Sequence, residues 1–184
     1  MPPNKRYPDA PHGKDTVQVG TEYENFVRDC LNPFGAIFWH WEDKTLQLFG
    51  ENRQGWEVKY DYRCFSRNPN GDGTNRLSIE LREKSERGNA RWIEGGILRN
   101  DNTWMYVQGN YEIIFVFAKN WLRRVYEEKI TAEDITTFNG TVQRFYLPID
   151  PDALRGAALI LEVVDKAKRQ ATPLRKDEKG QWRL

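Results

Sequence analysis

The chain has 184 residues, and its 28 basic and 27 acidic side chains leave a formal net charge of +1. A chain so nearly neutral does not attract polyanions as a whole, so contact with nucleic acid requires a local basic patch. Seven tryptophans, eight tyrosines and nine phenylalanines supply the apolar area of a folded domain, which a disordered chain lacks. No apolar run approaches the roughly 20 residues of a membrane span. The polar start is unlike a secretory signal, which predicts a cytoplasmic protein.

Composition divides the chain into three parts. Residues 1–16 hold four of the nine prolines among mixed charges, which predicts a flexible leader. Residues 166–184 are basic and lack an apolar period, which predicts a tail that is either frayed or an arm for nucleic acid. Residues 17–165 are expected to form one domain.

The first predicted element is a helix that begins at Thr21. Thr21 and Glu24 have the spacing of a capping box, in which each side chain binds a free amide of the first turn. Apolar residues then recur every three or four positions and form one helix face. These residues are Tyr23, Phe26, Val27, Cys30 and Leu31. Asn32 and Pro33 end the helix.

Five strands and two more helices are expected after it. The strands are expected at 36–41, 45–49, 56–62, 76–82 and 111–118. The helices are expected at 119–128 and 153–169. The glycine-bracketed turn 50–55 is predicted to join two strands into a hairpin over 45–62. This order is typical of an α/β or α+β domain with one mixed central sheet flanked by helices.

The most informative motif is Glu57-Val58-Lys59. Alternate residues of a strand point to the same face, so Glu57 and Lys59 project side by side while Val58 enters the opposite, apolar layer. A carboxylate can hold a divalent metal ion, and a cation beside it can stabilise a scissile phosphate or orient the attacking water. The alternative is an exposed strand on which Glu and Lys simply alternate. Asp61 continues the same face.

Around this triplet, the chain resembles the PD-(D/E)XK nuclease superfamily over about residues 20–118. The similar segments are Gly20-x-x-x-Glu24-x-x-Val27, GENRQGWEVKYD (50–61), TNRLSIELREKS (74–85) and GGILRNDNTWMYVQGNYEIIFVF (95–117). The chain looks most like a group of phage and mobile-element proteins that share a GEN-x-QG-x-E-[IV]-K-[YF]-D segment.

The resemblance implies an α/β restriction-endonuclease-like core and a DNA endo- or exonuclease that depends on Mg²⁺ or Mn²⁺. It implies that Glu57 and Lys59 are the catalytic acid and lysine, that Glu24 is the helix acid, and that Glu51 and Glu57 hold the metal. A phage-encoded enzyme would act in the host cytoplasm. Two alternatives stay open: an inactive nuclease fold that binds DNA or serves as a structural component, and a domain that binds RNA through its aromatic residues.

Two residues compete for the role of the first acid. Glu51 is separated from Glu57 by only five residues, which is shorter than the usual superfamily spacing, whereas Asp43 has thirteen residues between it and Glu57. In a hairpin over 45–62, however, Asp43 would lie on the order of 17 Å from Glu57 along the partner strand. Glu51 is therefore the preferred partner, and Asp43 is the alternative. A Glu in place of the usual Asp keeps the oxygen ligands that Mg²⁺ requires.

Other charged residues are expected to play secondary roles. Asp61 and Glu80 are secondary acids whose alternative role is that of solvent-facing strand charges. The candidate contacts to DNA phosphates are Arg53, Arg63, Arg67, Arg76 and Lys84. The expected partner is duplex or branched DNA, with a homodimer left open, and Trp92, Trp104 and Trp121 are expected in the core.

Overall fold

The computed structural model describes residues 16–35 and 55–182. The predicted strands at 36–41 and 45–49 lie outside the described residues, as do Asp43, Glu51 and Arg53. The predicted hairpin over 45–62 can therefore be followed only from residue 55 onward.

The first helix, α1, spans Thr16–Leu31 and begins earlier than the sequence predicts. The capping box predicted at Thr21 is wrong, because Thr21 lies inside the helix. A hydrogen bond from Gln18 Nε2 to Glu22 Oε1 (3.2 Å) joins the first turn to the next across four residues, the spacing at which side chains meet on a helix. The predicted apolar face is confirmed. All five of its residues are buried, with exposed fractions of 3 % or less.

Among the described residues, five strands form a mixed sheet. They are β1 (Trp56–Tyr60), β4 (Met105–Gly109), β5 (Ile113–Ala118), β8 (Leu159–Asp165) and β9 (Gln170–Pro173). They lie in the order β1-β4-β5-β8-β9, with β1 parallel to β4 and every other pair antiparallel. An α/β class with a mixed sheet was expected and is confirmed.

Four further described strands form a second, antiparallel sheet in the order β3-β2-β7-β6. They are β2 (Arg76–Glu83), β3 (Ile93–Glu94), β6 (Thr136–Phe138) and β7 (Val142–Pro148). The helix α3 (Lys119–Lys129) follows β5, as the sequence predicts, and the short helix α4 (Leu154–Gly156) precedes β8.

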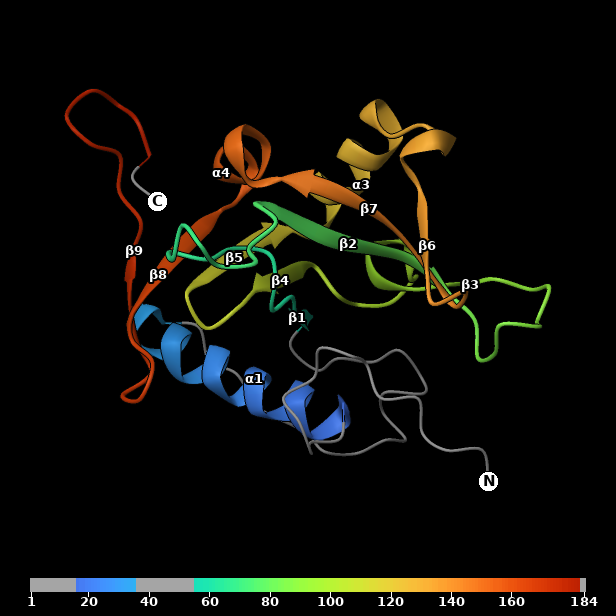
Figure 1. The fold of residues 1–184 in the computed structure, drawn as a ribbon, viewed down its shortest axis with the longest axis horizontal. Coiled ribbons are helices and arrows are strands. Elements are labelled where there is room, and N and C mark those ends of the chain that lie inside the picture. The colour runs from blue at the N-terminus through green and yellow to red at the C-terminus, as the bar shows by residue number, and fades with distance from the viewer. Residues whose placement is uncertain (1–15, 36–54, 183–184) are drawn as a thin grey trace.

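The first sheet is covered on both faces, as Figure 1 shows, with α1 on one side and β2 and β7 on the other. One core packs α1 against alternate residues of the sheet such as Val107, Ile114 and Leu161. The other core packs the intervening residues, such as Phe115 and Phe117, against β2, β7 and α3. The three central strands β4, β5 and β8 therefore send successive side chains into two different cores.

The helix predicted at 153–169 is wrong. Only Ala153, the last residue of a π-helical turn, and Leu154–Gly156 are helical there, and the segment continues as the strand β8. Ile160 enters one core while Leu161 and Val163 enter the other, so the strand is apolar on both faces and lacks the polar–apolar alternation of a surface strand. Such a run resembles a buried helix in sequence.

The predicted boundary at 165 falls inside a β-hairpin. Residues 170–173, which belong to the expected tail, form β9 and pair with β8, and Lys176 bridges to Trp182. Trp104 also differs from expectation, since it is 58 % exposed rather than in the core. None of the helices within 16–35 and 55–182 has the length and apolar character needed to cross a membrane.

Candidate active site

Glu57 and Lys59 project side by side from β1, as strand periodicity predicts. Val58, between them, packs with Trp56 and Tyr60 against the core under α1, so the charged pair faces the second sheet. Lys59 Nζ lies 3.0 Å from Glu57 Oε1. In the parallel register, Tyr106 of β4 is the partner of Glu57, and Gln108 is the partner of Lys59. The predicted same-face pair is thus a direct ion pair.

A second carboxylate reaches this pair from the other sheet. Lys59 Nζ lies 3.4 Å from Glu80 Oε2, and Glu80 comes from β2. The side chains of Glu57 and Glu80 are only 13 % and 19 % exposed, whereas that of Lys59 is 32 % exposed. Glu80, predicted as a secondary acid with a solvent-facing alternative, is therefore one of the three groups that form the site. We call Glu57, Lys59 and Glu80 the acid–lysine cluster.

Each carboxylate of the cluster has one oxygen without a partner among the described residues. Glu57 Oε2 and Glu80 Oε1 are buried and accept no hydrogen bond from any described residue. Buried carboxylate oxygens without partners are costly, and hard cations such as Mg²⁺ and Mn²⁺ prefer oxygen ligands of this kind. The two side chains therefore fit a divalent cation. Within 16–35 and 55–182, no group of three or more potential ligands gathers at one point.

The charges of the cluster act on their neighbours. Burial would lower the pKa of Lys59, but the negative charges of Glu57 and Glu80 outweigh it and raise that pKa above its ordinary value. The ammonium is therefore charged at neutral pH. Burial, followed by the same two carboxylates, raises the pKa of Tyr106 well above its ordinary value. Tyr106 is fully buried and is the partner of Glu57 in the β1–β4 pair.

β1 and β2 belong to different sheets, and hydrogen bonds made by the side chains of Asp61 and Gln108 connect them. Asp61 Oδ2 accepts hydrogen bonds from the Ser78 amide (2.8 Å) and from Gln108 Nε2 (2.9 Å). Gln108 Nε2 also donates to the Ser78 carbonyl oxygen at 2.9 Å. Burial raises the pKa of Asp61, and these hydrogen bonds offset part of the rise. Asp61, predicted as a secondary acid, thus anchors the strand that carries Glu80.

The loop at 95–103 closes another side of the cluster and is fixed from α3. Lys119 Nζ forms an ion pair with Asp101 Oδ1 at 2.6 Å and donates to the Arg99 carbonyl oxygen at 2.9 Å. Arg123 Nε donates to the carbonyl oxygen of Ile97 at 2.6 Å. The side chains of Lys119 and Asp101 are only 1 % and 6 % exposed. These bonds keep the turn at Gly95 pressed against Glu80.

Replacing Gly95 by alanine should shift the Glu80 carboxylate and weaken divalent-metal binding with little loss of stability. A Cβ at position 95 would lie 2.7 Å from Glu80 Oε1, closer than such atoms approach, while the backbone of Gly95 is extended and accepts alanine. The end of the Glu80 side chain can move, so we expect the melting temperature to change by only a few degrees, corresponding to less than about 1 kcal/mol.

The measurement is Mn²⁺ binding by calorimetry, together with a thermal melt. Gly88→Ala is the matched control, because nothing lies within 4 Å of a Cβ at that position. Equal Mn²⁺ affinity in the two variants would show that the ion does not depend on the position of Glu80 Oε1.

Glu24 belongs to the helix that covers the other face of the first sheet. It lies on α1, which packs against the Val58 face of the sheet, whereas Glu57 and Lys59 point to the opposite face. Its predicted role as a site acid stays a prediction. The choice between Glu51 and Asp43 lies outside the described residues.

The predicted DNA-contacting residues are scattered. Arg67 is bound to β8, where it pairs with Glu162 (3.1 Å) and donates to the Val163 carbonyl oxygen (2.7 Å). Arg63 lies 3.5 Å from Asp72, and Lys84 lies over the ring of Trp92. Arg76 alone among the described candidates lies on the same face of β2 as Glu80, and no hydrogen bond or ion pair joins its side chain to a described residue.

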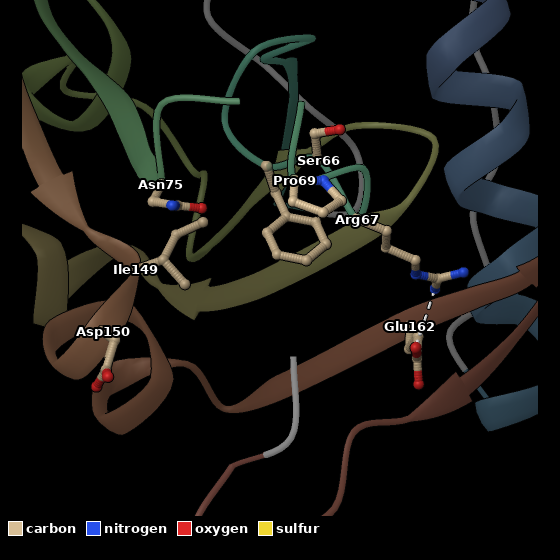
Figure 2. Close-up of a pocket in the computed structure, with 8 residues that line it drawn as sticks. Ser66, Arg67, Pro69, Asn75, Ile149, Asp150 and Glu162 are labelled. Atoms are coloured by element: carbon tan, nitrogen blue, oxygen red, sulfur yellow. Dashed lines mark ion pairs between the residues drawn. The ribbon is translucent and has the colours of Figure 1, made fainter. Parts of the chain in front are cut away.

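A pocket of about 670 Å³ lies apart from the cluster. Figure 2 shows Asn75, Ile149 and Asp150 on one side of it and the Arg67–Glu162 ion pair on the other. Glu57, Lys59 and Glu80 do not line it. Among the described residues that line the pocket, Arg67 is the one cation, and it is already paired with Glu162.

Sequence reasoning missed Gln108, Asp101, Lys119 and Gly95. Their roles depend on contacts between residues far apart in the chain, and the sequence carries no local pattern for such contacts. The segment 95–117, which contains Gly95, Asp101 and Gln108, drew attention only because it is part of the resemblance to the nuclease superfamily. In comparisons with protein-family models, with curated proteins and with solved structures, nothing matches this chain.

Proposed function

We propose that the protein is a nuclease that hydrolyses DNA phosphodiester bonds with Mg²⁺ or Mn²⁺, at a site formed by Glu57, Lys59 and Glu80 in a restriction-endonuclease-like core. The observation that carries the proposal is a pair of largely buried carboxylates that share one lysine, each with a buried oxygen that has no partner among the described residues. The order of the acid and the lysine on β1 is that of the nuclease family which the sequence resembles.

The roles of the three side chains follow from their positions. Glu57 and Glu80 would hold the cation, which supplies an activated water and offsets negative charge on the phosphate. Lys59 is a charged ammonium with about a third of its side chain exposed, so it can donate to a phosphate oxygen or to the attacking water. Its two carboxylate partners keep it within reach of the same phosphate.

Incubating the protein with supercoiled plasmid and with linear duplex DNA tests the proposal. We expect cleavage in Mg²⁺ or Mn²⁺ and none in EDTA. Intact DNA under all metal conditions would favour the alternative of an inactive nuclease fold. Cleavage in EDTA would exclude the metal-dependent mechanism.

Replacing Lys59 by methionine should slow cleavage by a factor on the order of 10²–10³ while DNA affinity stays nearly constant. One ammonium among several basic contacts adds little to binding, whereas its charge is needed most when negative charge develops on the phosphate. Single-turnover cleavage gives the rate, and fluorescence anisotropy in EDTA gives the affinity.

Lys129→Met is the matched control, because Lys129 is an exposed lysine on α3 that pairs with Asp152. If the Lys59 variant loses binding but cleaves each bound complex at the normal rate, Lys59 is an anchor for phosphate and not a catalytic group.

A further inference from the structure

The outer face of β2, β7 and β6 carries two arginines stacked on aromatic rings. The guanidinium carbon of Arg76 lies 3.9 Å from the centre of the Tyr146 ring. That of Arg144 lies 4.1 Å from the centre of the Phe138 ring and 5.2 Å from that of Tyr146. We call these four residues the arginine–aromatic row. It crosses the second sheet from β2 to β6.

The row adjoins the acid–lysine cluster. In the register of β2 and β7, Arg144 is the partner of Glu80, and Tyr146 is the partner of Ser78. The neighbouring residues Ile79 and Phe145 point into the core, so Glu80 and the row share the opposite face. The positive charges of Arg144 and Arg76 also act on Asp61, which lies at the end of β1.

The two guanidinium groups have unused hydrogen-bond donors. Within the described part of the chain, no hydrogen bond or ion pair engages the side chain of Arg76 or Arg144, and Arg144 Nε is buried without a partner. Other arginines near the cores are engaged, as Arg123 is by the carbonyl oxygens of Ile97 and Arg99. A guanidinium that stacks through its face presents its N–H edge, the geometry that suits a phosphate.

We propose that the arginine–aromatic row is a phosphate-binding surface, at which Arg76 and Arg144 bind the backbone of the DNA strand next to the bond that the acid–lysine cluster cuts. This inference rests on the proposed nuclease function for its ligand. Charge complementarity supports it, because a chain of net charge +1 must bind a polyanion through a local patch. Tyr146 and Phe138 position the arginines by restricting the planes of the guanidinium groups.

The test compares DNA binding by two double variants of equal charge. Arg76→Gln with Arg144→Gln removes the row's charges, and Arg124→Gln with Arg155→Gln removes two exposed charges on α3 and α4. The probe is a fluorescein-labelled duplex oligonucleotide, and anisotropy is measured in EDTA over a range of salt concentrations. Binding is thereby measured without cleavage.

For the row variant we expect at least a roughly tenfold loss of affinity at 0.1 M salt. We also expect the slope of log affinity against log salt to become shallower by about two, because two phosphate contacts are lost. The control variant should keep the wild-type affinity and slope. Thermal melts monitor folding.

If the glutamine variant is unfolded, Arg76→Lys with Arg144→Lys replaces it. We expect the lysine variant to keep the salt slope of the wild type but to lose DNA affinity severalfold, because lysine cannot stack on an aromatic ring as arginine does.

Affinity and slope equal to those of the control would overturn the proposal. It would also be overturned by a wild-type protein that binds no DNA, or by row changes that weaken heparin binding while DNA binding is unaffected. If the protein binds DNA through the row but cuts none in Mg²⁺, the phosphate-binding surface is supported and the proposed nuclease function is refuted. If the wild-type protein cuts DNA and the row variant binds DNA normally, the nuclease function is supported and the phosphate-binding row is refuted.

Discussion

Replacing Glu57 by glutamine should reduce metal-dependent DNA cleavage by a factor on the order of 10²–10³ while the protein still folds and binds DNA. The substitution keeps the size of the side chain but removes the negative charge that a divalent cation requires. Stability should be nearly unchanged or slightly higher, because Glu57 and Glu80 share a single ammonium and repel each other in the absence of metal. The measurements are cleavage rate, DNA affinity in EDTA and a thermal melt.

Glu80→Gln should reduce the cleavage rate by the same factor as Glu57→Gln. The double variant should cleave DNA no more slowly than either single variant. Groups that act as one unit are not additive, since losing one ligand already disables the site. Glu133→Gln is the control, an exposed acid on the turn after α3. Full activity of the Glu80 variant would show that Glu80 serves only as a partner of Lys59, and the second metal ligand would then have to be sought elsewhere.

Replacing Lys119 by methionine should lower the free energy of unfolding by about 3 kcal/mol. Removing one partner of a buried ion pair leaves the other charge uncompensated, which costs about 3–5 kcal/mol. The lower end applies because Asp101 Oδ1 keeps its bond from the Thr103 amide at 3.0 Å. Cleavage should also fall, because the loop that presses Gly95 against Glu80 loses its anchor. Denaturant unfolding measures the loss, and Lys129→Met is again the control.

The pH dependence of stability checks the same pair. Burial would raise the pKa of Asp101, but the bonds from Lys119 and Thr103 hold it below its ordinary value of 3.8. A carboxyl whose folded-state pKa is depressed stabilises the protein fully above its unfolded pKa. That stability is lost as the pH falls through the folded-state value. The difference in stability between wild type and the Lys119 variant should therefore shrink below about pH 4. A constant difference down to pH 2 would contradict the ion pair.

The sequence predicted the parts of the site that depend on local geometry. Glu57 and Lys59 follow from the period of one strand, and the apolar face of α1 follows from the period of one helix. Glu80 received only a secondary role, because its approach to Lys59 depends on how two sheets pack. Residues 153–169 were misread because burial on both faces removes the alternation that marks a strand.

The arginines illustrate the same limit. Arg67 and Arg76 look alike in sequence, yet the Arg67 side chain is bound to β8. The Arg76 side chain stacks on Tyr146, and no hydrogen bond or ion pair joins it to a described residue. Arg144 was not predicted at all, because β7 itself was not predicted. Basic character alone therefore does not distinguish an arginine that holds the fold together from one whose donors are free for a ligand.

The side-chain bonds to Ser78 have a consequence for self-association. On the side away from β7, residues 76–80 have no strand partner among the described residues, and a bare edge of this kind is a template onto which a second chain can add. Asp61 and Gln108 occupy the Ser78 amide and carbonyl groups that such a chain would need. The two polar residues that keep Glu80 beside Lys59 therefore also guard the molecule against edge-to-edge aggregation at its candidate active site.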